Sequence, residues 1–209
     1  YNITKSEGEL IVTATAAEVV VTITEPSKTV KYNGSEQSVT GYEVTHISNS
    51  LYTKNDFTFS GKAEAKGTDA GTYKMELKDT DFHNENSSFT NVKFVIVPGA
   101  LTIEKRNVTL TSASASRLYN GEALTNSTVT VTGDGFAENE GASYDVTGSQ
   151  TVVGKSDNVF EYTLNSGTKA DNYVISKVPG ELEVTPVTEK ITVTIKGHSD
   201  TKKYDGDEH

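Results

Sequence analysis

Four histidines are the side chains of this sequence best suited to acid–base catalysis or to binding a transition metal. They are His46, His83, His198 and His209, and each stands alone in a polar stretch. The chain has no cysteine, so thiolate nucleophiles, thiolate metal sites and disulfides are excluded. It also contains no G-x-S-x-G elbow, no P-loop and no G-x-G-x-x-G fingerprint. We therefore expect no catalytic residue, no metal site and no cofactor, and we interpret the histidines as surface residues.

The densest group of oxygen ligands lies at residues 79–86, which include Asp79, Asp81, Glu85 and two asparagines. Calcium takes about six to eight oxygen ligands, which a loop of this kind could gather. The stretch lacks the glycine and the final glutamate that complete an EF-hand loop. We expect a solvated loop here rather than a calcium site.

Three lysines were considered as partners in an isopeptide crosslink, which requires a buried lysine beside an Asn or Asp side chain. Lys31, Lys62 and Lys93 occupy predicted strands, and each alternates with an apolar neighbour. Alternation places them on the solvent face, where a lysine needs no special role. The sequence therefore favours no crosslink at these positions.

The elements that position these residues follow an internal repeat. A Tyr-Asn-Gly or Tyr-Asp-Gly sequence occurs three times, and its first two tyrosines are 87 positions apart (119 − 32). At this offset residues 19–77 align with residues 106–164 without a gap. The closing Val-Pro-Gly segments at 97–99 and 178–180 match at a shorter offset, so one length change falls between residues 78 and 91. A tandem duplication of folded modules tolerates such a change in a polar loop.

The tyrosine and the glycine of this repeated sequence are predicted to have a structural role. A tyrosine that returns once per repeat is best explained by a ring packed under a turn, with its hydroxyl bonded to the backbone. The glycine supplies the positive φ that such a turn requires. The residues concerned are Tyr32, Gly34, Tyr119, Gly121, Tyr204 and Gly206.

Two tyrosines that do not recur are the candidate ligand contacts. Tyr42 and Tyr52 belong to the first repeat, and Val129 and Asn139 stand at the matching positions of the second. An aromatic ring offers an apolar face on which a sugar can stack. We therefore predict that Tyr42 and Tyr52, rather than the recurring tyrosines, contact a glycan if the chain binds one.

The same period predicts the domain organisation. Residues 1–17 repeat the closing segment near residues 173–184 and are interpreted as the tail of a preceding repeat. Residues 18–105 and 106–188 are expected to be two complete β modules, and residues 189–209 the start of a following repeat. The passage from 101 to 110 contains no Gly/Ser linker, which favours a semi-rigid rod of stacked units.

Strict alternation of apolar and polar residues predicts strands with one buried face throughout both repeats. Short strands separated by Asn-Gly and Asp-Gly turns predict an all-β chain of small Ig-like β-sandwich modules. Residues 69–73, Asp-Ala-Gly-Thr-Tyr, are similar to a tyrosine corner, in which the Tyr73 hydroxyl bonds back to the backbone. Phe160 replaces this tyrosine in the second repeat. A β-grasp-like α+β module stays open as an alternative, because residues 48–56 and 135–142 leave room for a short helix.

Together, the Tyr-Asn/Asp-Gly turn, the Gly-Thr-Tyr strand start and the closing Pro-Gly-x-Leu segment resemble the YDG/MBG-type repeats of bacterial cell-surface proteins. The resemblance covers nearly the whole chain, although the second repeat lacks Gly-Thr-Tyr. It implies an extracellular, secreted protein on the bacterial cell surface, built of stacked modules that act as a stalk or adhesin.

The charge and hydropathy of the chain limit the kinds of partner that it can bind. The chain carries 19 Lys+Arg against 29 Asp+Glu, a net charge of −10, which disfavours nucleic acid and anionic lipid surfaces. No apolar run is long enough to insert into a membrane. The expected partners are neighbouring repeats of the same chain and a host or matrix glycan or protein. We expect a non-catalytic stalk or adhesin region; the alternatives are a carbohydrate- or mucin-binding module and an accessory region of a secreted surface enzyme.

Overall fold

The computed structural model describes residues 1–207, so His209 lies outside the described residues. All of its named strands lie between Val19 and Thr185, and the described residues form no α-helix. The helical turns are two short 3-10 segments, Asp79–Asp81 and Ala170–Asn172. Residues 48–56 and 135–141 form turns and loops and Ala142 begins a strand, so the helix required by the β-grasp-like alternative is not present there. The prediction of an all-β chain built from repeated small β modules is confirmed.

The first module contains four small sheets, with strand orders β4-β1-β9, β2-β10-β7, β3-β6 and β5-β8. Its strands are β1 (Val19–Thr24), β2 (Lys28–Lys31), β3 (Gln37–Thr40), β4 (Glu43–Ile47), β5 (Phe57–Phe59), β6 (Glu64–Gly67), β7 (Gly71–Lys74), β8 (Phe82–Asn84), β9 (Val92–Val97) and β10 (Ala100–Glu104).

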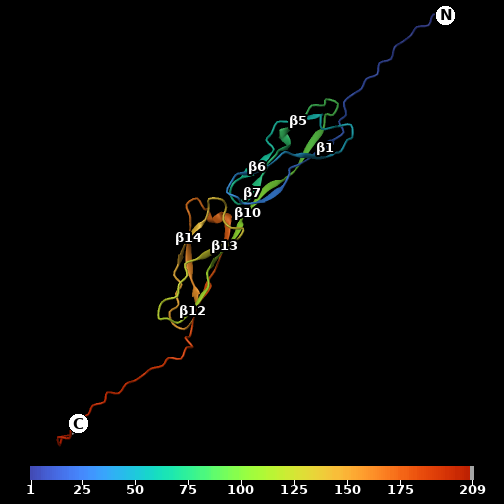
Figure 1. Ribbon diagram of the computed structural model, residues 1–209. Coiled ribbons are helices and arrows are strands. Elements are labelled where there is room, and N and C mark those ends of the chain that lie inside the picture. The colour runs from blue at the N-terminus through green and yellow to red at the C-terminus, as the bar shows by residue number, and fades with distance from the viewer. Residues whose placement is uncertain (208–209) are drawn as a thin grey trace.

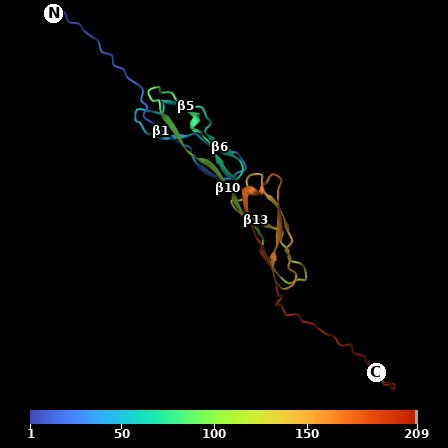
Figure 2. The same cartoon turned by 180° about the vertical axis from the view of Figure 1, so that it is seen from behind.

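The second module repeats this plan with sheets β13-β11-β17, β12-β18-β15 and β14-β16. Its strands are β11 (Arg106–Ser112), β12 (Ala115–Leu118), β13 (Val129–Gly133), β14 (Ala142–Val146), β15 (Gly154–Asn158), β16 (Phe160–Leu164), β17 (Tyr173–Val178) and β18 (Gly180–Thr185). The two modules lie end to end, and the chain termini extend from opposite ends (Figures 1 and 2).

Both modules contain the same two parallel strand pairs. In the first module β1 pairs with β9 and β2 with β10, and in the second β11 pairs with β17 and β12 with β18. Alternation predicted the strands and their buried faces but could not show which strands run parallel, because period two is the same for both directions. The recurrence of these long-range pairings shows that the sequence repeat is a structural repeat.

Each core is built on the central strand of its first sheet. Val19, Val21 and Ile23 alternate along β1 and are completely buried, and Val108 and Leu110 take the same places on β11. Burying aliphatic side chains of this size stabilises a fold by roughly 1.5–3 kcal/mol each. The buried residues of the first module and those at the near end of the second form one continuous hydrophobic cluster. The two cores therefore meet where the modules join.

A buried polar side chain fastens the closing Pro-Gly turn in each module. In the first, the Glu25 carboxylate accepts hydrogen bonds from the backbone N–H groups of Leu77 (2.8 Å) and Gly99 (2.7 Å). In the second, the Ser112 hydroxyl at the matching position accepts one from Gly180 (2.9 Å). A Cβ on Gly99 would lie 2.5 Å from the Glu25 carbonyl oxygen, so this close approach requires glycine.

The predicted tyrosine corner is present in the first module. The Tyr73 hydroxyl donates to the Asp69 carbonyl oxygen at 2.9 Å. In the second module the matching ladder position, opposite Leu182, is occupied by Ser156, whereas Phe160 is buried on β16 opposite Val146.

The terminal segments on either side of the strands are exposed. Within the first 14 residues and residues 186–207 no strand forms. The apolar residues there include Leu10, Val12, Ile191 and Ile195, and each of them is at least 83% exposed. No helix among the described residues is long and apolar enough to cross a membrane.

Candidate functional site

Of the two candidate ligand contacts, Tyr52 is part of the core. Its side chain is 2% exposed, and its ring packs against Phe57 and Phe89. Its hydroxyl donates to the Asp56 carbonyl and to Asn84 Oδ1 (2.9 Å), and burial raises the pKa of Tyr52 to about 12. The ring is therefore not available for stacking on a sugar.

Tyr42 is half-buried and more accessible. Its ring makes edge contacts with Phe59 (4.9 Å between centroids) and Phe82 (5.1 Å). It also lines a shallow hollow together with Pro26, Gly41 and neighbouring residues. Part of the ring can meet a ligand, but most of its contacts serve the first module.

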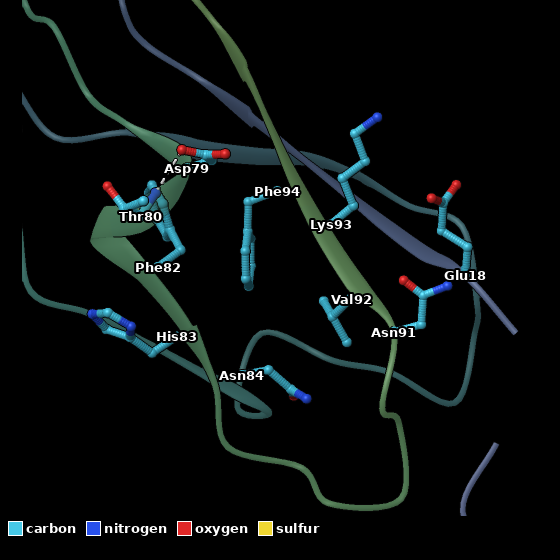
Figure 3. A pocket seen from close by; sticks show the side chains of 10 residues that line it. All are labelled: Glu18, Asp79, Thr80, Phe82, His83, Asn84, Asn91, Val92, Lys93 and Phe94. Carbon is cyan, nitrogen blue, oxygen red and sulfur yellow. Dashed lines mark hydrogen bonds between the residues drawn. The ribbon is translucent and has the colours of Figure 1, made fainter. Parts of the chain in front are cut away.

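An open groove of about 540 Å³ lies between β9 and the segment formed by residues 79–84. Figure 3 shows the rings of Phe82 and Phe94 between these elements, with Asp79 and His83 on one side. The His83 Nε2 atom is 2.9 Å from the Ser60 hydroxyl. The groove is formed by the segment in which the two repeats differ in length.

The oxygen-rich loop at residues 79–86 uses several of its oxygens internally. Asp79 accepts from the Thr80 backbone N–H, and Asp81 from that of Lys78, both at 2.8 Å. Among the described residues no group of three or more His, Asp or Glu side chains is arranged to hold a metal ion.

The three lysines that could take part in an isopeptide crosslink are not in the core. Lys31 forms an ion pair with Asp134 at 2.8 Å. Lys62 lies before β6 rather than in a strand, and it forms an ion pair with Glu64. Lys93 is an exposed residue of β9.

A cluster of side-chain contacts lies at the junction between the modules, which we call the joint. Tyr32, at the far end of the first module, is 3% exposed. Its hydroxyl donates to Glu140 of the second module, which also accepts from the Tyr173 hydroxyl at 2.8 Å. The two tyrosine rings meet edge to face, with centroids 5.7 Å apart and an interplanar angle of 84°. One carboxylate thus bridges tyrosines from different modules.

Arg106 holds the backbone on both sides of the joint. Its guanidinium donates to the Tyr32 carbonyl oxygen (3.1 Å) in the first module. It also donates to the carbonyl oxygens of Asp134 and Gly135 (2.8 Å) in the second. Its planar fork of donors can serve several carbonyls at once, which a lysine cannot do in the same geometry. The Asp134 side chain bonds the Asn107 N–H and Lys31, and these contacts lower its pKa, the Lys31 contact most.

A second group of contacts flanks the joint. Asn172 is completely buried; its Oδ1 accepts from the Ala70 N–H (2.7 Å), and its Nδ2 donates to Asp69 Oδ1 (3.0 Å). Lys169 pairs with the other Asp69 oxygen at 2.7 Å. The asparagine hydrogen bond first, and then the lysine, lower the pKa of Asp69. Residues of the tyrosine corner thereby contact the second module.

The recurring tyrosines have different environments. Tyr32 is buried by the following module, whereas Tyr119 is 45% exposed and Tyr204 is 95% exposed. The sequence predicted a ring packed under a turn with its hydroxyl bonded to the backbone. At Tyr32 the ring packs against the next module and its hydroxyl bonds the Glu140 carboxylate instead, and the exposed rings of Tyr119 and Tyr204 do not fit the prediction. Arg106 and Glu140 were missed because neither recurs at the matching place in the other repeats, and Tyr173, which recurs as Tyr1, was missed because its contact with Tyr32 joins residues far apart in sequence.

Comparison with known proteins identifies one segment of the chain. Residues 19–105 match the family model of the MBG domain, a repeat module typical of bacterial surface proteins. This segment, the first module, is an MBG domain. No curated protein and no solved structure gave a significant match.

The joint predicts different effects of the same substitution in the two modules. Tyr32→Phe removes a hydrogen bond to a carboxylate and should lower the free energy of unfolding by about 1.5–3 kcal/mol. Tyr119→Phe, at the exposed equivalent, should change it by less than about 0.5 kcal/mol. Urea unfolding measures both; equal effects would contradict the contacts assigned to Tyr32.

The joint also predicts sensitivity to alkali. The pKa of Tyr32 and that of Tyr173 are both raised to about 12, against 10.0 for a free tyrosine. Burial is the largest cause for both residues, and at Tyr32 the hydrogen bond to Glu140 is the next largest. The folded state favours the protonated phenols, so their contribution is complete below about pH 10 and is lost as pH rises through about 12. In a pH titration followed by tyrosinate absorbance, some tyrosines should ionise only well above about pH 10. The Tyr32→Phe variant should have one fewer such tyrosine than the unaltered chain. Ionisation of all tyrosines near pH 10 in the folded chain would refute this.

Proposed function

We propose that this chain is a non-catalytic stalk region of an extracellular, bacterial cell-surface protein, and that its modules space an adhesive part away from the cell. The observation that carries the proposal is the joint, in which Glu140 accepts hydrogen bonds from a tyrosine of each module. A stalk must transmit orientation as well as length, and a joint held by side chains from both modules does so.

The connection between the modules supports this role. Only Lys105 separates β10 from β11, so the chain passes from one module to the next with almost no slack. Domains joined by small polar interfaces usually move relative to one another. Here buried Tyr32 and Tyr173 belong to one hydrophobic cluster that spans the junction, which opposes such motion.

The repeat pattern also assigns the two terminal segments of the chain. We propose residues 18–105 and 106–188 as complete units, with residues 1–17 and 189–209 as parts of neighbouring repeats. The exposed alternating residues Ile191, Val193 and Ile195 match the first strand of each module and would be buried once a further unit is complete. The same stalk could serve an accessory region of a secreted surface enzyme.

Solution scattering and surface labelling test the stalk. Small-angle X-ray scattering of the 209-residue chain should give a rod-like profile for the two modules. Antibodies against the modules should label intact cells of the source bacterium, with an antibody to a cytosolic protein as the control. Labelling only after lysis, or a compact scattering profile, would overturn the proposal.

A carbohydrate- or mucin-binding module is the second candidate, favoured by the groove along β9. Its volume of about 540 Å³ falls within the usual range of ligand sites, and Asp79 and His83 offer polar groups beside the Phe82 and Phe94 rings. Tyr42 lies against Phe82 and links the groove to the contact expected from the sequence.

Binding to a glycan and mucin array separates the two candidates. If the groove binds sugar, His83→Ala should reduce binding at least about tenfold, the loss expected for one hydrogen bond in a binding site. His46→Ala, at an exposed histidine outside the groove, is the matched control. No binding by the wild-type chain, or equal binding by both variants, would reject the groove as a glycan site.

A further inference from the structure

The contacts of the joint are not available at the other module ends. In the parallel ladder of the second module, Arg106 pairs with Tyr173 at the end that faces the first module. The same ladder position in the first module is occupied by Val19 and Val92. Neither valine side chain can donate to a carbonyl or to a carboxylate.

The following repeat also lacks the arginine. The spacing of Tyr119 and Tyr204 places Ile191 at the position of Arg106. At the far end of the second module, Leu118 stands where the first module has Lys31. The ion pair that Lys31 makes with Asp134 therefore has no counterpart on that side.

The connections differ in length as well. A single residue, Lys105, joins β10 to β11. Between β18, which ends at Thr185, and Ile191 lie residues 186–190, and they are exposed. Residues 14–18 form a connection of the same length before β1, but Thr15 is tied to the first module by hydrogen bonds with Ser88 and Thr90.

We propose that Arg106 and Tyr173 form a recognition socket for the Tyr-Asn-Gly turn of the preceding module, and that this socket determines which neighbours are held rigidly. The socket makes the two modules between Val19 and Thr185 one rigid unit. The array bends at residues 186–190, where the following repeat carries Ile191 and brings no such socket. This inference rests on the proposed stalk and divides it into rigid pairs.

The physical basis is the set of partners that Arg106 holds. Its guanidinium bonds three carbonyl oxygens, of which Tyr32 belongs to the neighbouring module and Asp134 and Gly135 to its own. These bonds fix the Tyr-Asn-Gly turn relative to the loop that carries Glu140. A residue with no hydrogen-bond donors in its side chain leaves the turn and the loop free to move apart, although each module stays folded.

Distance measurements by pulsed electron spin resonance test the socket in the full 209-residue chain. The chain has no cysteine, so Glu43→Cys and Thr130→Cys place one label at equivalent exposed strand positions of the two modules. The unaltered joint should give a narrow distance distribution. Arg106→Ile, which introduces the residue found at position 191, should widen it at least about twofold. Arg117→Ile, the same change within the second module, should leave the width unchanged.

A second variant keeps the test decisive if Arg106→Ile affects folding. Replacing Lys105 by a copy of residues 186–190 should widen the distribution with every side chain of the socket retained. Circular dichroism confirms that the modules remain folded. A narrow distribution in both variants overturns the socket but leaves the stalk standing. A broad distribution in the unaltered chain overturns the rigid stalk itself.

Discussion

The geometry of this chain depends on one carboxylate shared by two modules. Glu140 accepts hydrogen bonds from Tyr32 and Tyr173, whose side chains are 3% and 4% exposed. Glu140 itself is only partly buried, so the groups that lose a partner when the modules separate are the two buried tyrosine hydroxyls. The orientation of the first module relative to the second is therefore tied to a hydrogen-bonding requirement as well as to apolar contact.

The repeated fold presents these groups at the right place. Parallel pairing of β11 with β17 brings Arg106 and Tyr173, far apart in sequence, to the same end of one sheet. The turn after β2 brings Tyr32 to the opposite end of the first module, and Gly34 adopts a φ of 83° there. Because β10 continues into β11 after one residue, the two ends must meet. The position of the joint thus follows from where these strands begin and end.

Much of the fold was predictable, since alternation and repeat spacing report directly on buried faces and on module length. The tyrosine corner at Tyr73 was also predictable, because its hydrogen bond is local in sequence. The parallel pairings were not, as they join segments more than sixty residues apart, such as Val19 and Val92. The joint was hidden for a related reason. Repeat alignment draws attention to residues that recur, whereas Arg106 and Glu140 of the joint do not recur. Tyr52 was chosen for being unique to the first module, but its burial shows that a unique aromatic residue can equally serve one module's core.

The central claim is that the two modules behave as one unit through the joint, and calorimetry of thermal unfolding tests it most directly. The account predicts a single transition in which the calorimetric enthalpy equals the van't Hoff enthalpy for both modules together. Two separate transitions, each with the enthalpy of one module and unaffected by Tyr32→Phe, would contradict it.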